Sequence, residues 1–143
     1  MLSSEVKSGT MSGVADFDAY TFSGSNGDRV LISAITTSGS LDTWIYVYPP
    51  GGGLPVINTF AQDRAEVQVT ATGTWTIVME DNGTNTAGGY NMSMLNVTSG
   101  PYTTGGDTDG GAIVSNEIKT GQFHQAGDFD AFAFSGSAAQ RIV

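Results

Sequence analysis

The feature that most constrains the fold of this 143-residue chain is an internal repeat. Residues 3–31 align without a gap with residues 115–143, at an offset of 112 positions, and 13 of the 29 aligned pairs are identical. A repeat unit of this length corresponds to a whole domain. The chain is therefore expected to contain one full copy over residues 1–97, a glycine-rich linker over residues 98–112, and the N-terminal part of a second copy over residues 113–143.

The second copy stops at Ile142 and Val143, which correspond to Val30 and Leu31 at the start of an apolar strand. Two arrangements fit this pattern. The chain is a section of a tandem array, which we favour, or its last quarter carries strands that complete a neighbouring subunit. In both cases residues 113–143 are not expected to fold alone, because an isolated pair of strands is marginally stable. The start of the chain also lacks the basic and apolar regions of a signal peptide.

Alternating and β-branched runs bounded by Gly, Asn, Asp and Pro predict an all-β fold. In the run TWTIVME, Trp75 and Ile77 belong to one row and Thr76 to the opposite one, so a single row is expected to face the core. Eight short strands of this kind are typical of an antiparallel β-sandwich. The expected strands are residues 4–8, 18–23, 29–37, 43–48, 56–60, 65–71, 74–80 and 89–97.

Composition excludes several classes of function. Fourteen acidic residues against five basic ones give a net charge of −9, which repels a nucleic-acid backbone. No apolar stretch approaches the roughly 18–20 residues of a membrane span. The absence of cysteine excludes disulfides, zinc-thiolate sites and thiol catalysis. Plentiful glycine and hydroxyl side chains, with 13% charged residues, are typical of a secreted β protein.

Catalysis by histidine is also excluded. The only histidine, His124, corresponds to Ser12 in the full copy, so no repeated histidine-dependent mechanism is possible and a Ser-His-Asp triad is ruled out. Composition alone leaves a carboxylate pair for glycoside hydrolysis open. Solvated carboxylates in turns are the favoured interpretation. We therefore predict that the chain is not an enzyme.

Pairs of aspartates recur along the chain in a pattern that suits calcium, which takes six to eight oxygen ligands, often from glycine-rich turns. Asp16 and Asp18 lie two positions apart at the entry to a strand, so both side chains can leave the same face. The alternative is that aspartate is a favoured turn residue, whose side chain caps its own backbone. The candidate ligands for Ca²⁺ are Asp16, Asp18, Asp42, Asp107, Asp109, Asp128 and Asp130.

Three aromatic residues alternate along one strand, at Trp44, Tyr46 and Tyr48. They point the same way and could form a stacking platform for sugar rings. The alternative, which the sequence favours, is that Trp44 and Tyr46 belong to the core while Ile45 and Val47 cover the other sheet face. Aromatic residues supply much of the buried area in a small sandwich.

Four runs give the chain a resemblance to a known family: DFDAYTFSGSNGDRVLISA, LDTWIYVYPPGG, TGTWTIVMEDNG and GGYNMSMLNV. In this order they resemble the bacterial pre-peptidase C-terminal domain family, over nearly all of residues 3–97 and again from residue 115. The resemblance implies a jelly-roll-like β-sandwich, secreted as an accessory module of peptidases or within large surface proteins, and related to calcium-dependent collagen-binding modules. It also implies that Asp16, Asp18 and Asp42 match the recurrent acidic positions.

Together these features predict a non-catalytic, extracellular bacterial module with a structural or adhesive role. We expect it to build a surface fibre or filament through tandem or strand-exchanged copies, so its first partner would be another copy of itself. The alternative is a calcium-dependent accessory domain of a secreted hydrolase, which would bind an extracellular matrix protein such as collagen, or a polysaccharide.

Overall fold

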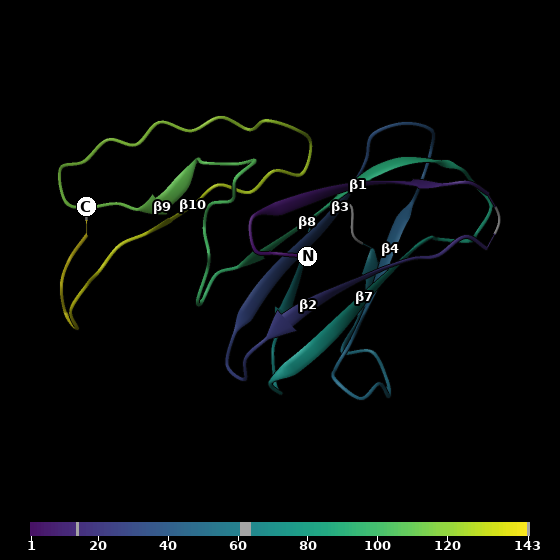
Figure 1. Cartoon of the computed structure of the whole chain (residues 1–143), viewed down its shortest axis with the longest axis horizontal. Coiled ribbons are helices and arrows are strands. Elements are labelled where there is room, and N and C mark those ends of the chain that lie inside the picture. Colours follow the sequence, from purple (N-terminus) through teal and green to yellow (C-terminus); the bar gives the residue numbers. More distant parts are fainter. Residues whose placement is uncertain (14, 61–63, 143) are drawn as a thin grey trace.

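Two four-stranded antiparallel sheets stack to form a β-sandwich, with a separate C-terminal portion beside it (Figure 1). The computed structural model describes residues 1–13, 15–60 and 64–142. No helix long and apolar enough to cross a membrane occurs in this described part of the chain. The expectation of an all-β fold is confirmed.

The strand order identifies the sandwich as a jelly roll. One sheet has the order β1-β8-β3-β6 and the other has the order β2-β7-β4-β5. Apart from the β4–β5 hairpin, the chain crosses from one sheet to the other at every step, as it does in a jelly roll. The strands of the sandwich are β1 (Glu5–Met11), β2 (Asp18–Gly24), β3 (Arg29–Thr36), β4 (Thr43–Tyr48), β5 (Ile57–Phe60), β6 (Ala65–Gln68), β7 (Gly73–Asp81) and β8 (Gly88–Asn96).

The core lies between the two sheets and follows the expected alternation. Trp75, Ile77 and Met79 of β7 are fully buried, while the residues between them face outward. Phe22 of β2 stacks on Trp75 with 6.2 Å between ring centroids. The indole Nε1 donates a hydrogen bond of 3.0 Å to the carbonyl of Ala71, so the one polar atom of this buried ring is satisfied.

A buried tyrosine connects the two sheets. Tyr90 of β8 is fully buried, and its hydroxyl donates to Oδ2 of Asp18 at 2.5 Å and lies 2.6 Å from the hydroxyl of Tyr20. Its ring lies against Gly9 of β1, where a Cβ atom would be only 2.4 Å from the ring. Burial raises the pKa of Tyr90 well above its ordinary range, and the hydrogen bond to Asp18 adds to this effect.

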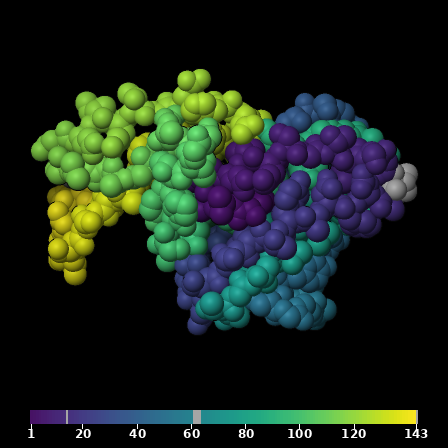
Figure 2. Space-filling view, viewed as in Figure 1, coloured from purple at the N-terminus to yellow at the C-terminus, as the bar shows by residue number. Residues whose placement is uncertain are grey.

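The C-terminal segment, residues 98–142, covers part of the outer face of the β1-β8-β3-β6 sheet. Nδ2 of Asn91 donates a hydrogen bond of 3.0 Å to the carbonyl of Ala126, and Gly127 approaches Ile35 and Ser93. As a result, β8 is buried on both of its faces from Tyr90 onward. Figure 2 shows this segment, in green to yellow, packed against the purple N-terminal strand.

The beginning of the second copy repeats local turns of the first copy but not its strand pairing. Oδ2 of Asp16 accepts a hydrogen bond from the Ser12 amide at 2.7 Å, and Oδ2 of Asp128 accepts one from the His124 amide at 2.9 Å. However, β10 (Ala131–Ala133) pairs in parallel with β9 (Gly110–Ala112) from the expected linker. The counterpart of β10 in the first copy pairs antiparallel with β7. The division into two copies and a linker stays a prediction.

Candidate functional site

Four of the predicted calcium ligands come together in an acidic cluster, which consists of Asp107, Asp109, Asp128 and Asp130. One carboxylate oxygen from each of Asp107, Asp128 and Asp130 lies within 4.8 Å of the others. A second group with the same spacing contains Asp107, Asp109 and His124. The cluster forms because the turn before β9 packs against the turn before β10.

Turn hydrogen bonds hold several of these carboxylates in place. Oδ2 of Asp128 accepts from the His124 amide at 2.9 Å, and Oδ1 of Asp107 accepts from the Asp109 amide at 3.1 Å. Oδ2 of Asp109 accepts from the Gln122 amide at 2.6 Å. The capping role that we considered as an alternative to metal binding is therefore present at Asp107 and Asp128, whereas Asp109 bonds a residue thirteen positions away.

Two carboxylate oxygens of the cluster lack a partner among the described residues. Oδ2 of Asp107 and Oδ1 of Asp130 are buried without a hydrogen bond, and Asp107 as a whole is only 6% exposed. Burial raises the pKa of Asp130, as does repulsion from Asp107, Asp128 and Asp109. Two charges 4 Å apart repel by about 1 kcal/mol in water and by about 4 kcal/mol at an effective dielectric constant of 20. A bound cation would reverse this unfavourable interaction.

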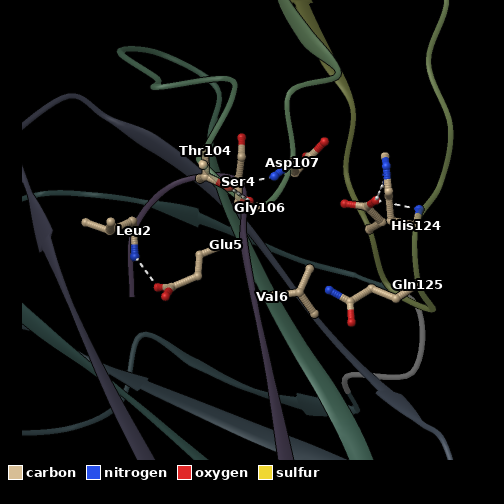
Figure 3. Close-up of a pocket in the computed structure, with 11 residues that line it drawn as sticks. Leu2, Ser4, Glu5, Val6, Thr104, Gly106, Asp107, His124 and Gln125 are labelled. Carbon is tan, nitrogen blue, oxygen red and sulfur yellow. Dashed lines mark hydrogen bonds and ion pairs between the residues drawn. The ribbon is translucent and has the colours of Figure 1, made fainter.

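A cleft of about 370 Å³ lies beside the acidic cluster. Its walls come from the N-terminal residues around Leu2 and Glu5, the turn at residues 104–107, and the loop that carries His124 and Gln125 (Figure 3). Nδ1 of His124 lies 3.8 Å from Asp128 and 3.9 Å from Asp109. From the sequence, His124 was considered only as a candidate catalytic residue, and nothing in the sequence connected it with the aspartates.

The other three predicted calcium ligands, Asp16, Asp18 and Asp42, lie in neither of the two groups that contain Asp107. Asp16 accepts hydrogen bonds from the amide and hydroxyl of Ser12, and Asp18 accepts one from the hydroxyl of Tyr90. Asp42 accepts a hydrogen bond of 3.2 Å from Nδ2 of Asn82. The structure therefore gives each of these aspartates a hydrogen-bonding role within the first copy.

The turn after β7 depends on a buried carboxylate, Asp81. Asp81 accepts hydrogen bonds from the amides of Asp42, Asn85 and Thr86 and from the hydroxyl of Thr86. Burial by itself raises the pKa of Asp81, but these hydrogen bonds outweigh burial, so the pKa is below its usual value. Asp81 therefore stabilises the turn in its charged form.

An aromatic face forms on the outside of the other sheet, and consists of Trp44, Tyr46 and Tyr48 of β4 with Phe60 of β5. The favoured interpretation of these β4 residues as core was wrong. Ile45 and Val47 are fully buried and take the inward positions, which leaves the aromatic row partly exposed on the outer surface. Both rows of β4 are apolar, so alternation by itself did not distinguish them.

The rings of the aromatic face contact one another in two pairs. Trp44 meets Phe60 edge to face with 4.3 Å between centroids, as expected from their pairing across β4 and β5. Tyr46 and Tyr48 stack at 26° with 6.4 Å between centroids. Phe60 is 50% exposed. These contacts orient large side chains that do not contribute to the core.

Hydrogen bonds also hold the polar groups of the aromatic face in place. Nε1 of Trp44 donates a hydrogen bond of 2.6 Å to Oδ1 of Asn58, and the hydroxyl of Tyr46 donates one of 2.7 Å to Oε1 of Glu80. The hydrogen bond to Glu80 raises the pKa of Tyr46 to about 12, with a further contribution from burial. The tyrosine is therefore uncharged at neutral pH and keeps this hydrogen bond.

Comparison with known proteins identifies the fold but not a family. No protein-family model and no curated protein matches the chain. The chain is similar in structure to PliG of Aeromonas hydrophila, a periplasmic inhibitor of g-type lysozyme. The similarity has a TM-score of 0.50 at 15% identity, over 64% of this chain and 85% of that one. The same inhibitor of Salmonella Typhimurium gives a TM-score of 0.46 at 19% identity, over 63% of this chain and 87% of that one.

These comparisons correct the functional expectation. The prediction of a fibre-forming or adhesive repeat was wrong, because the chain shares its fold with a solved protein that is described as a lysozyme inhibitor. Association with further copies of the chain also finds no support. The Aeromonas protein is described as a periplasmic inhibitor, which agrees with the predictions of a non-catalytic chain and of a location outside the bacterial cytoplasm.

Proposed function

We propose that this chain is a non-catalytic module that binds another protein outside the bacterial cytoplasm, and that it does so through the aromatic face. The observation that carries the proposal is the partial exposure of Trp44, Tyr46 and Tyr48 on the outer side of β4, while Ile45 and Val47 fill the core. The aromatic row is not needed to fill the sandwich. Its place on the surface is therefore best explained by contact with another molecule.

Protein interfaces favour this type of surface. Tyrosine and tryptophan are enriched among the residues that dominate binding energy, because each provides a large, rigid apolar surface with a polar end. Here, the ring contacts and the hydrogen bonds to Asn58 and Glu80 hold Trp44 and Tyr46 in place before any partner arrives. Side chains that are already ordered lose less conformational entropy on binding.

The jelly roll also supports the proposal, because the Aeromonas inhibitor has a similar fold. That protein is named for its action on g-type lysozyme, so g-type lysozyme is the first partner to test. The resemblance to the pre-peptidase C-terminal family is compatible with this proposal, since it implies a secreted, non-catalytic jelly roll. Membership in that family stays a proposal.

The test is titration calorimetry of the chain with g-type lysozyme, together with an assay of lysis by the enzyme. Trp44→Ala and Tyr46→Ala should each weaken binding by about 30-fold or more, which is the effect of removing a residue that dominates an interface. Thr21→Ala, on β2 of the same sheet, is the matched control and should leave binding unchanged. Binding that is insensitive to both aromatic substitutions would place the interface elsewhere, and absence of binding would exclude this enzyme as the partner.

For the acidic cluster we propose a calcium ion held by Asp107, Asp128 and Asp130. The buried oxygens of Asp107 and Asp130 that lack partners fit this proposal, because a cation would satisfy them. The carboxylate oxygens offered by these residues lie within 4.8 Å of one another, and oxygen ligands of this kind are preferred by calcium. Bound calcium would neutralise part of the cluster and hold the turn before β9 against the turn before β10.

Thermal melts with calcium and with a chelator test this second proposal. Calcium at 100 times its dissociation constant should stabilise the chain by about 2.7 kcal/mol. Asp128→Asn should abolish the response. Asp16→Asn is the matched control, because Asp16 makes the same turn hydrogen bond in the first copy but lies outside the cluster. Identical melts with calcium and chelator would exclude the ion.

A further inference from the structure

We infer that the aromatic face recognises an arginine side chain of its protein partner, with the guanidinium group placed over Tyr46 and Tyr48 and paired with Glu80. The inference rests on the proposed function and adds the chemistry of the partner. It depends on three features of this face: which charge it carries, how its rings are arranged, and how exposed it is.

The first feature is charge. Among the described outward-facing residues of β2, β7, β4 and β5, Glu80 is the only one with a charged side chain. Its carboxylate lies next to the aromatic row and accepts a hydrogen bond from the hydroxyl of Tyr46. The chain as a whole has a net charge of −9, so a cationic partner is attracted over long range.

The second feature is ring geometry. Tyr46 and Tyr48 are inclined by only 26°, with 6.4 Å between their centroids. A cation is attracted to an aromatic face when it lies within about 6 Å of the ring centroid, so one guanidinium can interact with both rings. Arginine suits this arrangement better than lysine, because its planar group stacks on rings and also donates to a carboxylate. Oε1 of Glu80, 2.7 Å from the Tyr46 hydroxyl, places that carboxylate beside the rings.

The third feature is access. The outer face of the β1-β8-β3-β6 sheet is partly covered by the C-terminal segment, through Asn91 and Gly127. On the β2-β7-β4-β5 sheet, Thr21, Asn58 and Thr74 are exposed on the outward side. A partner segment can therefore lie across β4 without displacing any part of the chain that the structure describes.

A sugar chain is the other class of ligand that stacks on aromatic rings. The observations favour a protein, because the edge-to-face packing of Trp44 on Phe60 turns these two rings away from a common plane. A flat sugar platform needs coplanar rings. The carboxylate of Glu80 beside the tyrosines provides a charge complement for a cation and not for a neutral sugar.

The experiment is a titration of the ¹⁵N-labelled full chain, followed by NMR, with the blocked peptide Gly-Arg-Gly-Arg-Gly. The same peptide with citrulline in place of arginine is the isosteric, uncharged control. We expect arginine-dependent shift changes at Tyr46, Tyr48 and the indole of Trp44. Glu80→Gln keeps an acceptor for Tyr46 but loses the charge, and should weaken peptide binding by about tenfold. Glu66→Gln, in the other sheet, is the matched control and should have no effect.

Each result either supports or overturns the inference. Equal binding of the citrulline peptide, shifts confined to the acidic cluster, or no effect of Glu80→Gln would overturn it. Shifts on the aromatic face with chitotetraose and none with the arginine peptide would replace it with a sugar site. If Trp44→Ala abolishes binding of a protein partner while the arginine peptide fails, the proposed function stands and only the arginine inference fails. If Trp44→Ala has no effect on that partner, the proposed function itself fails.

Discussion

The contact between Gly9 and Tyr90 provides the sharpest test of how the sandwich is held together. Tyr90 is fully buried, and a Cβ atom at position 9 would lie 2.4 Å from its ring carbon Cζ and from its hydroxyl oxygen. In Gly9→Ala the ring must therefore move. Such a movement pulls the hydroxyl away from Asp18, to which it donates at 2.5 Å.

The magnitude follows from three contributions. Overpacking of a filled core costs about 1–3 kcal/mol, and loss of a hydrogen bond to a charged group costs about 1.5–3 kcal/mol. Alanine in a strand regains about 0.5–1 kcal/mol relative to glycine. Gly9→Ala should therefore lower the free energy of unfolding by about 2–5 kcal/mol. Urea denaturation followed by tryptophan fluorescence measures this change.

Two further variants test the reasoning. Gly121→Ala is the matched control, because Gly121 occupies the position of Gly9 in the second copy, and the atom nearest to its added Cβ would be Oδ2 of Asp130, at 3.0 Å. It should cost less than about 1 kcal/mol. In a Tyr90→Phe background, the cost of Gly9→Ala should fall by about 1 kcal/mol or more, since the hydroxyl is already lost. A cost below about 0.5 kcal/mol for Gly9→Ala alone would refute the idea that glycine is required here.

The remaining predictions concern the core and the turn after β7. Trp75→Ala should cost about 3–5 kcal/mol in urea denaturation, because the ring is fully buried, and the partly exposed Trp44→Ala should cost clearly less. An equal loss for both would contradict the assignment of one tryptophan to the core and the other to the surface. Because the pKa of Asp81 is lowered in the folded protein, its carboxylate contributes stability that is complete above about pH 4 and is lost as the pH falls through the lowered pKa. Asp81→Asn should therefore be less stable than the natural chain at pH 7, and thermal melts should show the difference shrinking at low pH; a constant difference would refute this mechanism.

Much of the sandwich was predictable because its determinants are local. Where one row of a strand is apolar and the other polar, as with Trp75 and Thr76 in β7, alternation identifies the buried side. The turn chemistry around Asp16 and Asp128 also follows from sequence, since in both copies the aspartate accepts a hydrogen bond from the backbone amide four positions before it. The approximate strand positions and the sandwich therefore needed no knowledge of the tertiary structure, although β1 runs on to Met11 instead of ending at residue 8 and β6 ends at Gln68 instead of residue 71.

The candidate sites depended on contacts between distant parts of the chain. Both rows of β4 are apolar, so only the packing of the two sheets decided that Ile45 faces inward and Trp44 outward. Phe60 joined the aromatic face because β5 pairs with β4 in a register that sets it opposite Trp44. Composition and spacing carry no information about such a register.

The acidic cluster shows the same division. The sequence by itself determined that aspartates recur in turns, which identified Asp107 and Asp128 as candidate ligands together with Asp16 and Asp18. Only the tertiary structure decided that Asp107 meets Asp128, because β9 and β10 pair in parallel and bring their two preceding turns together. In the first copy, β8 supplies Tyr90 to bond Asp18, so the equivalent carboxylate is satisfied within the sandwich. The physical reason is that a carboxylate's role is set by the partners that surround it, and these come from other strands.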